Sequence, residues 1–286
     1  MRRKWTFVLL LVVGVVAPMA AVAVTQRWNI TEVQEPLRRT LKFSSGAGDK
    51  TLAVDSIRGS IEVLGFDGDS VEMIARKTIH ADSDASLHAA TEEVKLDITE
   101  GADIVSIFVD EPGRQPSDFR IWQDRGYAVD FDFELRVPRN TSLRLRTVVG
   151  DIDIKDVDGD FNVESTVGNL DLNRISGSGR IRTVSGMVTA VFARNPLKDS
   201  YFGSTNGDVD VTFPRNLSAD IRFKTFNGGV YTDFPIGAVP VRTGSSEVIT
   251  GRILTRNSFS RARIGTGGPT LQFDGFNGNV RIRQAK

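Results

Sequence analysis

The sequence predicts an all-β protein whose main part is a parallel β-solenoid, or β-helix, with coils of 18–21 residues. We also expect one short helix and an N-terminal signal or membrane segment. Three observations lead to this fold class: a motif recurs five times between residues 141 and 239, apolar and polar residues alternate around it, and the chain has no cysteine. Without disulfides, the fold depends on burial and backbone pairing.

An export or membrane segment opens the chain. Three basic residues at 2–4 precede an uncharged run over 5–24, which ends in the small residues Ala21 and Ala23. This A-x-A spacing is typical of a signal-peptide cleavage site, so we expect cleavage after Ala23. An uncleaved anchor over 1–24 is the alternative, because a membrane-spanning helix needs about 20 apolar residues. Both alternatives place the rest of the chain outside the cytoplasm, in the periplasm or at the cell surface.

The next part of the chain divides into a linker and a β-rich region. Residues 25–40 are polar and predict a linker. Period-two alternation over 41–138 predicts strands. Within this region only residues 83–94 predict a helix, which Ser83 or Asp84 can cap while its apolar residues share one face.

Residues 139–286 are organised by the internal repeat. Each copy has a serine or threonine three positions before a glycine, an apolar residue two positions before that hydroxyl, and another two positions after the glycine. The glycines are Gly150, Gly168, Gly186, Gly207 and Gly228, and two outlying copies add Gly59 and Gly278. The upstream apolar residues are Leu145, Val163, Ile181, Phe202 and Phe223, and the downstream ones are Ile152, Leu170, Val188, Val209 and Val230.

A period of this length is the size of one solenoid coil. One coil cannot bury its own apolar residues, but stacked coils can, so the two apolar sets are expected to form two internal columns. The glycines are expected at the turns between faces, where there is no room for a Cβ. The alternative is an antiparallel β-sandwich of hairpins, for which the Asn-Gly pairs at 206–207 and 227–228 are turn signals.

The repeat also carries a family resemblance. The segments TVVGDIDI, STVGNLDL and STNGDVDV, with the earlier SIRGSIEVLGFDGDSVEM and the closing GGPTLQFDGFNGNVRI, resemble the bacterial putative-adhesin family of β-solenoid proteins, a domain of unknown function. The resemblance covers most of residues 41–284. It implies an extracytoplasmic, non-catalytic solenoid with an export or anchoring segment. Its motifs define the repeat and carry no chemistry.

Composition excludes several function classes. Lys and Arg together number 36, as do Asp and Glu, and no basic stripe is visible, so we expect no nucleic-acid partner. The absence of cysteine excludes thiolate zinc sites, iron–sulfur clusters and cysteine nucleophiles. With two histidines the chain offers little for acid–base catalysis or metal binding. We therefore predict no catalytic residue, no cofactor and no metal site.

Aspartates that follow the glycines are the strongest hint of chemistry. They are Asp151, Asp153, Asp171, Asp208 and Asp210. Stacked in a ladder, they could bind a divalent cation or act as paired carboxylates on a glycan. Asn169 and Met187 interrupt the ladder, which favours solvated decoration of an exposed face.

A second hint lies in the loop over 111–128, which combines Phe119, Trp122 and Tyr127 with Arg120 and Arg125. Loops that protrude from a solenoid often carry recognition, so these residues are a candidate ligand-binding edge. Alternatively, the aromatic residues cap an open end of the stack.

The sequence thus predicts an exported, non-enzymatic cell-envelope protein, adhesin-like or a scaffold. Its expected partner is an unidentified envelope component, glycan or protein, with a membrane contact through the N-terminal segment if this is uncleaved. One alternative is a carbohydrate-active β-helix enzyme, a lyase or hydrolase, that uses the stacked aspartates. The other is a component of envelope-stress signalling.

Overall fold

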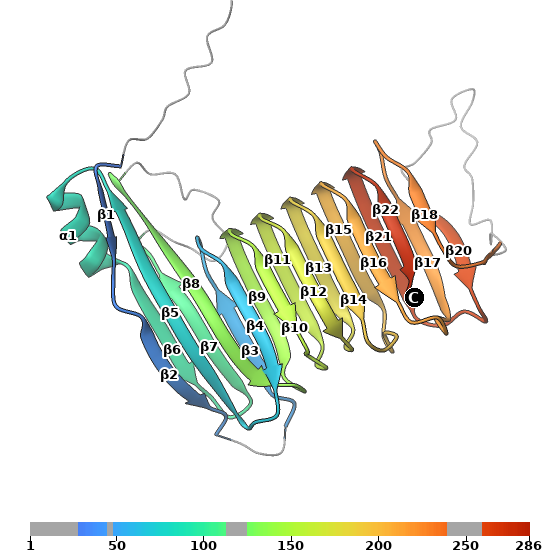
Figure 1. Ribbon diagram of the computed structural model, residues 1–286, viewed down its shortest axis with the longest axis horizontal. Helices are drawn as coiled ribbons and strands as arrows, with labels where there is room; N and C mark the ends of the chain where they lie inside the picture. Colours follow the sequence, from blue (N-terminus) through green and yellow to red (C-terminus); the bar gives the residue numbers. More distant parts are fainter. Residues whose placement is uncertain (1–27, 45–47, 113–124, 239–258) are drawn as a thin grey trace, which may run out of the picture.

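The computed structural model describes residues 28–44, 48–112, 125–238 and 259–286. Within these ranges the chain is nearly all β, with one helix and two large, mostly parallel sheets that lie face to face (Figure 1). This confirms the predicted all-β class. No helix in the described ranges is long and apolar enough to cross a membrane, and the apolar run over 5–24 lies outside them.

The two sheets, here sheet A and sheet B, each contain eleven strands in the described ranges. Sheet A runs in the order β1 (Ile30–Val33), β5 (Ser70–Ala81), β8 (Tyr127–Pro138), β4 (Ile61–Phe66), β10 (Ile152–Lys155), β12 (Leu170–Ile175), β14 (Val188–Phe192), β16 (Val209–Phe213), β22 (Val280–Gln284) and β18 (Val230–Thr232), with β2 (Leu37–Lys42) also paired to β5. Sheet B runs in the order β19 (Ile236–Ala238), β20 (Ser260–Ile264), β17 (Ala219–Lys224), β21 (Thr270–Asn277), β15 (Ser200–Asn206), β13 (Gly179–Ser185), β11 (Phe161–Val167), β9 (Ser142–Val149), β3 (Thr51–Asp55), β7 (Ile104–Asp110) and β6 (Lys95–Glu100).

Each copy of the repeat gives one strand to each sheet, and neighbouring copies pair in parallel. Val163 lies between Leu145 and Ile181 in sheet B, as predicted for the first apolar column. In sheet A, Leu170 lies between Ile152 and Val188, as predicted for the second. All of these side chains are buried in one continuous core between the sheets. The antiparallel sandwich of hairpins is therefore wrong for the repeat region.

The closing copy of the repeat lies inside the stack and not at its end. Strands β21 and β22, red in Figure 1, are inserted between the fourth copy (β15 and β16) and the fifth (β17 and β18). In sheet B, Phe273 consequently separates Phe202 from Phe223, which the sequence predicts as neighbours. The insertion preserves the core because the closing copy also places apolar residues in the two columns, Phe273 and Val280, although Gly275 takes the place of the hydroxyl. The chain reaches this place through β20, which runs antiparallel to β17.

The repeat glycines stack directly on one another. A Cβ on Gly168 would lie 1.9 Å from the carbonyl oxygen of Gly150, and one on Gly186 would lie 2.0 Å from that of Gly168. The conserved spacing of the hydroxyl has a cause in the same place: Ser165 Oγ donates to the carbonyl of Gly150 at 3.1 Å, and Thr183 Oγ1 donates to that of Gly168 at 3.0 Å. These two hydroxyls thus tie their copies to the previous one, whereas the buried hydroxyl of Thr147 has no partner among the described residues.

The helix is confirmed as α1 (Asp84–Glu93). Ser83 is its N-cap, and its side chain accepts the N–H of Ser86 at 3.3 Å. Ala90 and Val94 are buried against the sheets, and the helix contacts β5 and β8. It covers one end of the core (Figure 1).

The predicted linker over 25–40 is wrong for most of its described residues, because β1 and the first part of β2 lie within it. Both strands pair antiparallel with β5, where Ile30 lies opposite Ala81 and Leu37 opposite Ala75. These strands could not be predicted from sequence because most of their side chains are exposed and polar, so apolar and polar residues hardly alternate along them. The β-rich region over 41–138 is also continuous with the repeats, since β3 pairs with β9 and β4 with β10.

Candidate binding surface

The predicted ligand-binding edge is only partly within the described residues. Tyr127 is buried at the start of β8, and its hydroxyl donates to Glu93 Oε2 of α1 at 2.8 Å. Burial raises the pKa of this phenol. Arg125 Nη1 lies 3.6 Å from the same carboxylate, so these two residues tie β8 to the helix. Phe119, Arg120 and Trp122 lie outside the described residues, and the edge remains a prediction.

The repeat aspartates are largely used inside the stack. Asp208 accepts the backbone N–H of Asn279 at 2.8 Å and an Arg281 N–H at 2.6 Å, and these two contacts hold the pKa of its carboxyl below the ordinary value. Asp210 is bound by Arg283 through two nitrogens. Asp151 accepts the backbone N–H of Asn169. These carboxylates join neighbouring rungs and do not converge on one cleft.

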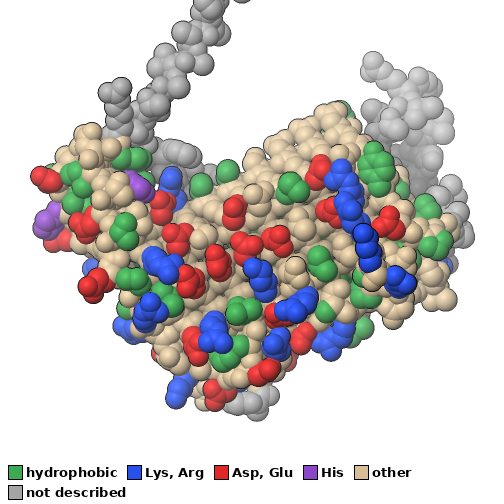
Figure 2. Space-filling view, in the orientation of Figure 1, with side chains coloured by type: hydrophobic (Ala, Val, Ile, Leu, Met, Phe, Trp, Pro, Cys, Tyr) green, Lys and Arg blue, Asp and Glu red, His purple; other side chains and the backbone are tan. Residues whose placement is uncertain are grey.

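An acidic row nevertheless crosses the outer face of sheet A. Glu134, Glu62, Asp153 and Asp171 lie in register on four neighbouring strands, and Figure 2 shows acidic side chains gathered across the middle of this face. Burial, and then the charge of Asp153, raise the pKa of Asp171. The described part of the chain has no group of three acidic, histidine or cysteine residues arranged to hold a metal ion.

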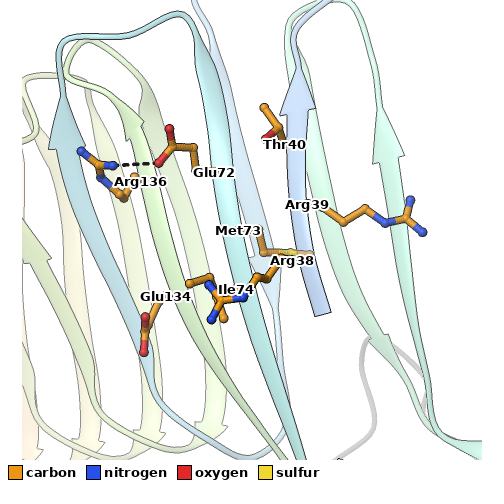
Figure 3. A pocket seen from close by; sticks show the side chains of 8 residues that line it. All are labelled: Arg38, Arg39, Thr40, Glu72, Met73, Ile74, Glu134 and Arg136. Carbon is orange, nitrogen blue, oxygen red and sulfur yellow. Dashed lines mark hydrogen bonds and ion pairs between the residues drawn. The ribbon is translucent and has the colours of Figure 1, made fainter. Parts of the chain in front are cut away.

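A hollow of about 340 Å³ lies beside this row, between β2, β5 and β8 (Figure 3). Its carboxylates already have cationic partners. Arg136 donates to Glu72 at 2.8 Å, and Arg76, which lies just outside the hollow, pairs with Glu134. Figure 3 shows Arg39 pointing away from these residues. Both carboxylates that line the hollow are therefore ion-paired.

A larger concave surface lies on the opposite face of the molecule, over sheet B. One hollow of about 800 Å³ and another of about 460 Å³ share Phe161, Asn162, Gly179 and Asp199, so they form one continuous groove. A third, of about 80 Å³, adjoins the first at Tyr201. The groove crosses the strands and follows the direction in which the copies stack.

A single row of side chains runs along this groove, and we call it the arginine row. Its members lie in register on seven neighbouring strands and point outward, because each flanks a buried core position. It consists of Arg144, Asn162, Arg180, Tyr201, Gln272, Arg222 and Arg261. The row contains no carboxylate.

Contacts within the row leave its cations available. The Arg180 guanidinium lies 4.2 Å from the centre of the Tyr201 ring, a cation–π contact that fixes its position. The Tyr201 hydroxyl donates to Asp274 at 3.3 Å, and burial raises the pKa of this phenol, so it stays neutral at neutral pH. Arg222 lies over Phe259 at 5.2 Å, and its Nε is buried without a hydrogen-bond partner in the described structure.

The carboxylates beside the row differ in their partners: Glu164 and Asp199 line the groove without an ion pair to a described residue, whereas two others are bound by cations. Asp160 binds Lys198 at 2.7 Å, and Asp220 binds Arg263 at 2.7 Å. The guanidinium groups of Arg144, Arg180, Arg222 and Arg261 form no hydrogen bond or ion pair with any described residue. A charge without a protein partner is best satisfied by solvent or by a ligand of opposite sign.

Sequence reasoning missed the arginine row, although a signal for it exists. In each copy the row residue immediately precedes the first apolar column, as Arg144 precedes Leu145 and Arg180 precedes Ile181. Aligning the polar positions of the copies, and not only their glycines and aspartates, would have shown arginine recurring there. The place of Gln272 between Tyr201 and Arg222 could not be found in this way, because it depends on the inserted closing copy.

No family model matches the chain, and no curated protein matches it. Among solved structures it is similar to a putative cell adhesion protein from Clostridium sporogenes, at 10% identity and a TM-score of 0.41, over 88% of this chain and 100% of that one. It is similar to a putative adhesin from Bacteroides fragilis at 11% identity and a TM-score of 0.34, over 88% and 98% of the two chains. A putative lipid binding protein from Parabacteroides distasonis matches at 8% identity and a TM-score of 0.23, over 88% and 97%. These likenesses do not identify a ligand or an activity.

Proposed function

We propose that this chain is an exported, non-enzymatic binding module of the cell envelope, adhesin-like in role and built as a two-sheet β-solenoid. In this proposal the outer face of sheet B is the recognition surface. Export is supported by the basic residues 2–4 and the apolar run over 5–24, which ends in an A-x-A pattern. The solenoid is supported by the parallel pairing of successive copies.

The observation that carries the binding role is the continuous groove over sheet B. It is long, shallow and polar, and it is built on strands whose inward side chains are locked in the core. A rigid sheet with a long concave face suits an extended ligand bound through many weak contacts. A small substrate is more often held in an enclosed, mostly apolar pocket.

The enzymatic alternative requires carboxylates that converge on a substrate. Asp208 and Asp210 are instead each bound by an arginine of β22, and Asp153 and Asp171 lie on the open face of sheet A. This arrangement favours a binding role over hydrolysis or lyase chemistry.

The test is a binding screen with the chain as cells export it, recovered from the envelope, with its N-terminus sequenced. The panel contains cell-wall polymers, soluble glycans and envelope proteins, and each is also incubated with the protein and checked for cleavage. We expect saturable binding of at least one polymer without cleavage, and an N-terminus outside the cytoplasm. Turnover of any polymer would refute the non-enzymatic role, and no binding across the panel would refute the module.

A further inference from the structure

The arginine row has features that point to one class of ligand. We propose that it binds a linear glycan that carries carboxylate groups, such as a polyuronate. This inference rests on the proposed function, because it names the ligand class of the same groove.

The first argument is charge. Four arginines line the row without a carboxylate among them and without an ion pair in the described structure. The guanidinium group presents its N–H donors in a planar fork that matches a carboxylate, so these side chains suit carboxylates better than neutral hydroxyls. Arg222 itself lines the groove, and its buried Nε has no hydrogen-bond partner in the described structure.

The second argument is spacing. Neighbouring strands of a sheet lie about 4.8 Å apart, so Arg144 and Arg180, two strands apart, are separated by about 10 Å along the groove. Carboxylates on alternate residues of an extended, 1,4-linked glycan repeat over a similar length. Asn162 lies between the two arginines, and its amide can donate to and accept from the sugar hydroxyls there.

The third argument concerns other polyanions. A single-stranded nucleic acid would need exposed aromatic faces for its bases, but the face of Tyr201 is covered by Arg180. An extended peptide is usually recognised through a free strand edge, whereas the row lies across strands that are paired on both sides. The row combines arginines with two amides and a phenol, which fits a hydroxyl-rich anionic chain better.

The experiment measures binding of the full exported chain to polygalacturonate by calorimetry. Two reference polymers are fully methyl-esterified polygalacturonate, which has the same backbone without charge, and polyglutamate, which has charge without sugar. We expect binding only to polygalacturonate, and weaker binding as the salt concentration rises. Equal binding of the methyl ester would refute the role of charge. Equal binding of polyglutamate would refute the inference that the ligand is a glycan.

Two double variants locate the site. Arg180→Gln with Arg222→Gln removes two charges from the row, and we expect affinity to fall about twenty-fivefold, roughly fivefold for each lost contact. Lys42→Gln with Lys155→Gln removes two charges from sheet A, and we expect less than a threefold change. Thermal melts check that both double variants fold. We expect both to fold, because all four side chains lie on the outer faces of the sheets. Equal losses in the two variants would overturn the site.

The outcomes also separate this inference from the proposed function. Binding to a neutral glycan or an envelope protein, unchanged in the arginine variant, would refute the arginine row as the site while the binding module stands. Absence of binding to every polymer and protein of the wider panel would refute both.

Discussion

Replacing one repeat glycine by alanine tests how the copies are held together. Gly168 lies in the middle of the stack, and its backbone φ of +158° is unfavourable for any residue with a Cβ. The added Cβ of Gly168→Ala would lie 1.9 Å from the carbonyl oxygen of Gly150 and 2.5 Å from its carbonyl carbon. Because ordinary contact begins near 3.5 Å, the two copies must separate there by about 1.5 Å.

This separation has a cost that follows from the bonds at the same rung. Gly150 N–H donates to the carbonyl of Val167 at 2.9 Å, and Ser165 donates to the carbonyl of Gly150 at 3.1 Å. Losing two buried hydrogen bonds costs about 2–3 kcal/mol, and the strained backbone adds about 1–2 kcal/mol. We therefore expect Gly168→Ala to lower the free energy of unfolding by about 4 kcal/mol.

The assay is urea denaturation followed by far-ultraviolet circular dichroism. Gly237→Ala is the matched control, because a Cβ there has one neighbour within 4 Å, the carbonyl oxygen of Arg263 at 3.8 Å. We expect that control to change the free energy of unfolding by about 0.5 kcal/mol or less. A cost below about 1 kcal/mol for Gly168→Ala, or one equal to the control, would refute the steric argument.

Three further predictions use paired variants or two pH values. Thr183→Val should lower the free energy of unfolding, measured by urea denaturation, by about 1–2 kcal/mol, because it removes the hydrogen bond to the carbonyl of Gly168 in the preceding copy. Thr147→Val should be neutral or stabilising, because that buried hydroxyl has no partner among the described residues. Equal losses in the two variants would contradict this. Phe273→Ala, in the closing copy, should lower the free energy of unfolding by about 3–5 kcal/mol by urea denaturation, because the ring is fully buried. Phe226→Ala, at an exposed position, should lower it by less than about 1 kcal/mol. An equally small loss for Phe273→Ala would show that the inserted copy contributes little to stability. The pKa of Asp171 is raised from 3.8, so ionisation of its carboxyl is disfavoured in the folded state, and Asp171→Asn should stabilise the protein by a few tenths of a kcal/mol at pH 7. This gain should disappear as the pH falls through the raised pKa to 3.8 and lower, because the carboxyl is then protonated in both states. Urea denaturation midpoints that shift equally at pH 7 and below pH 3.8 would argue against this reasoning.

The repeat could be predicted from sequence because its causes are local. A glycine is required wherever the chain turns against the previous copy, and an apolar residue is required at each position that faces the core, so both recur at a fixed spacing. Gly168 and Leu170 have the places that their spacing predicts. The helix could also be predicted from sequence, because Ser83 caps it and Leu87, Ala90 and Val94 share the face that packs on the core.

Other parts of the fold depend on neighbours that the sequence does not reveal. Strands β1 and β2 carry few apolar residues, and they exist because β5 offers a free edge for pairing. The aromatic residues of the 111–128 loop are predicted from sequence to be exposed, yet Tyr127 is buried, and its hydroxyl donates to Glu93. Residue type alone does not tell an aromatic side chain that recognises a ligand from one that seals the core.

Sequence alone therefore determined the class of the fold, the register of the copies and the two core columns, since periodic contacts between like copies leave a periodic pattern. The order of the copies in space was determined only in three dimensions. Phe223 and Phe273 are both phenylalanines at the same position of the repeat, so sequence does not tell which one lies beside Phe202. In the structure the chain returns through β20, and Phe273 lies between Phe202 and Phe223. The arginine row has the same origin, because its side chains come from separate copies and become one surface only when the strands are paired.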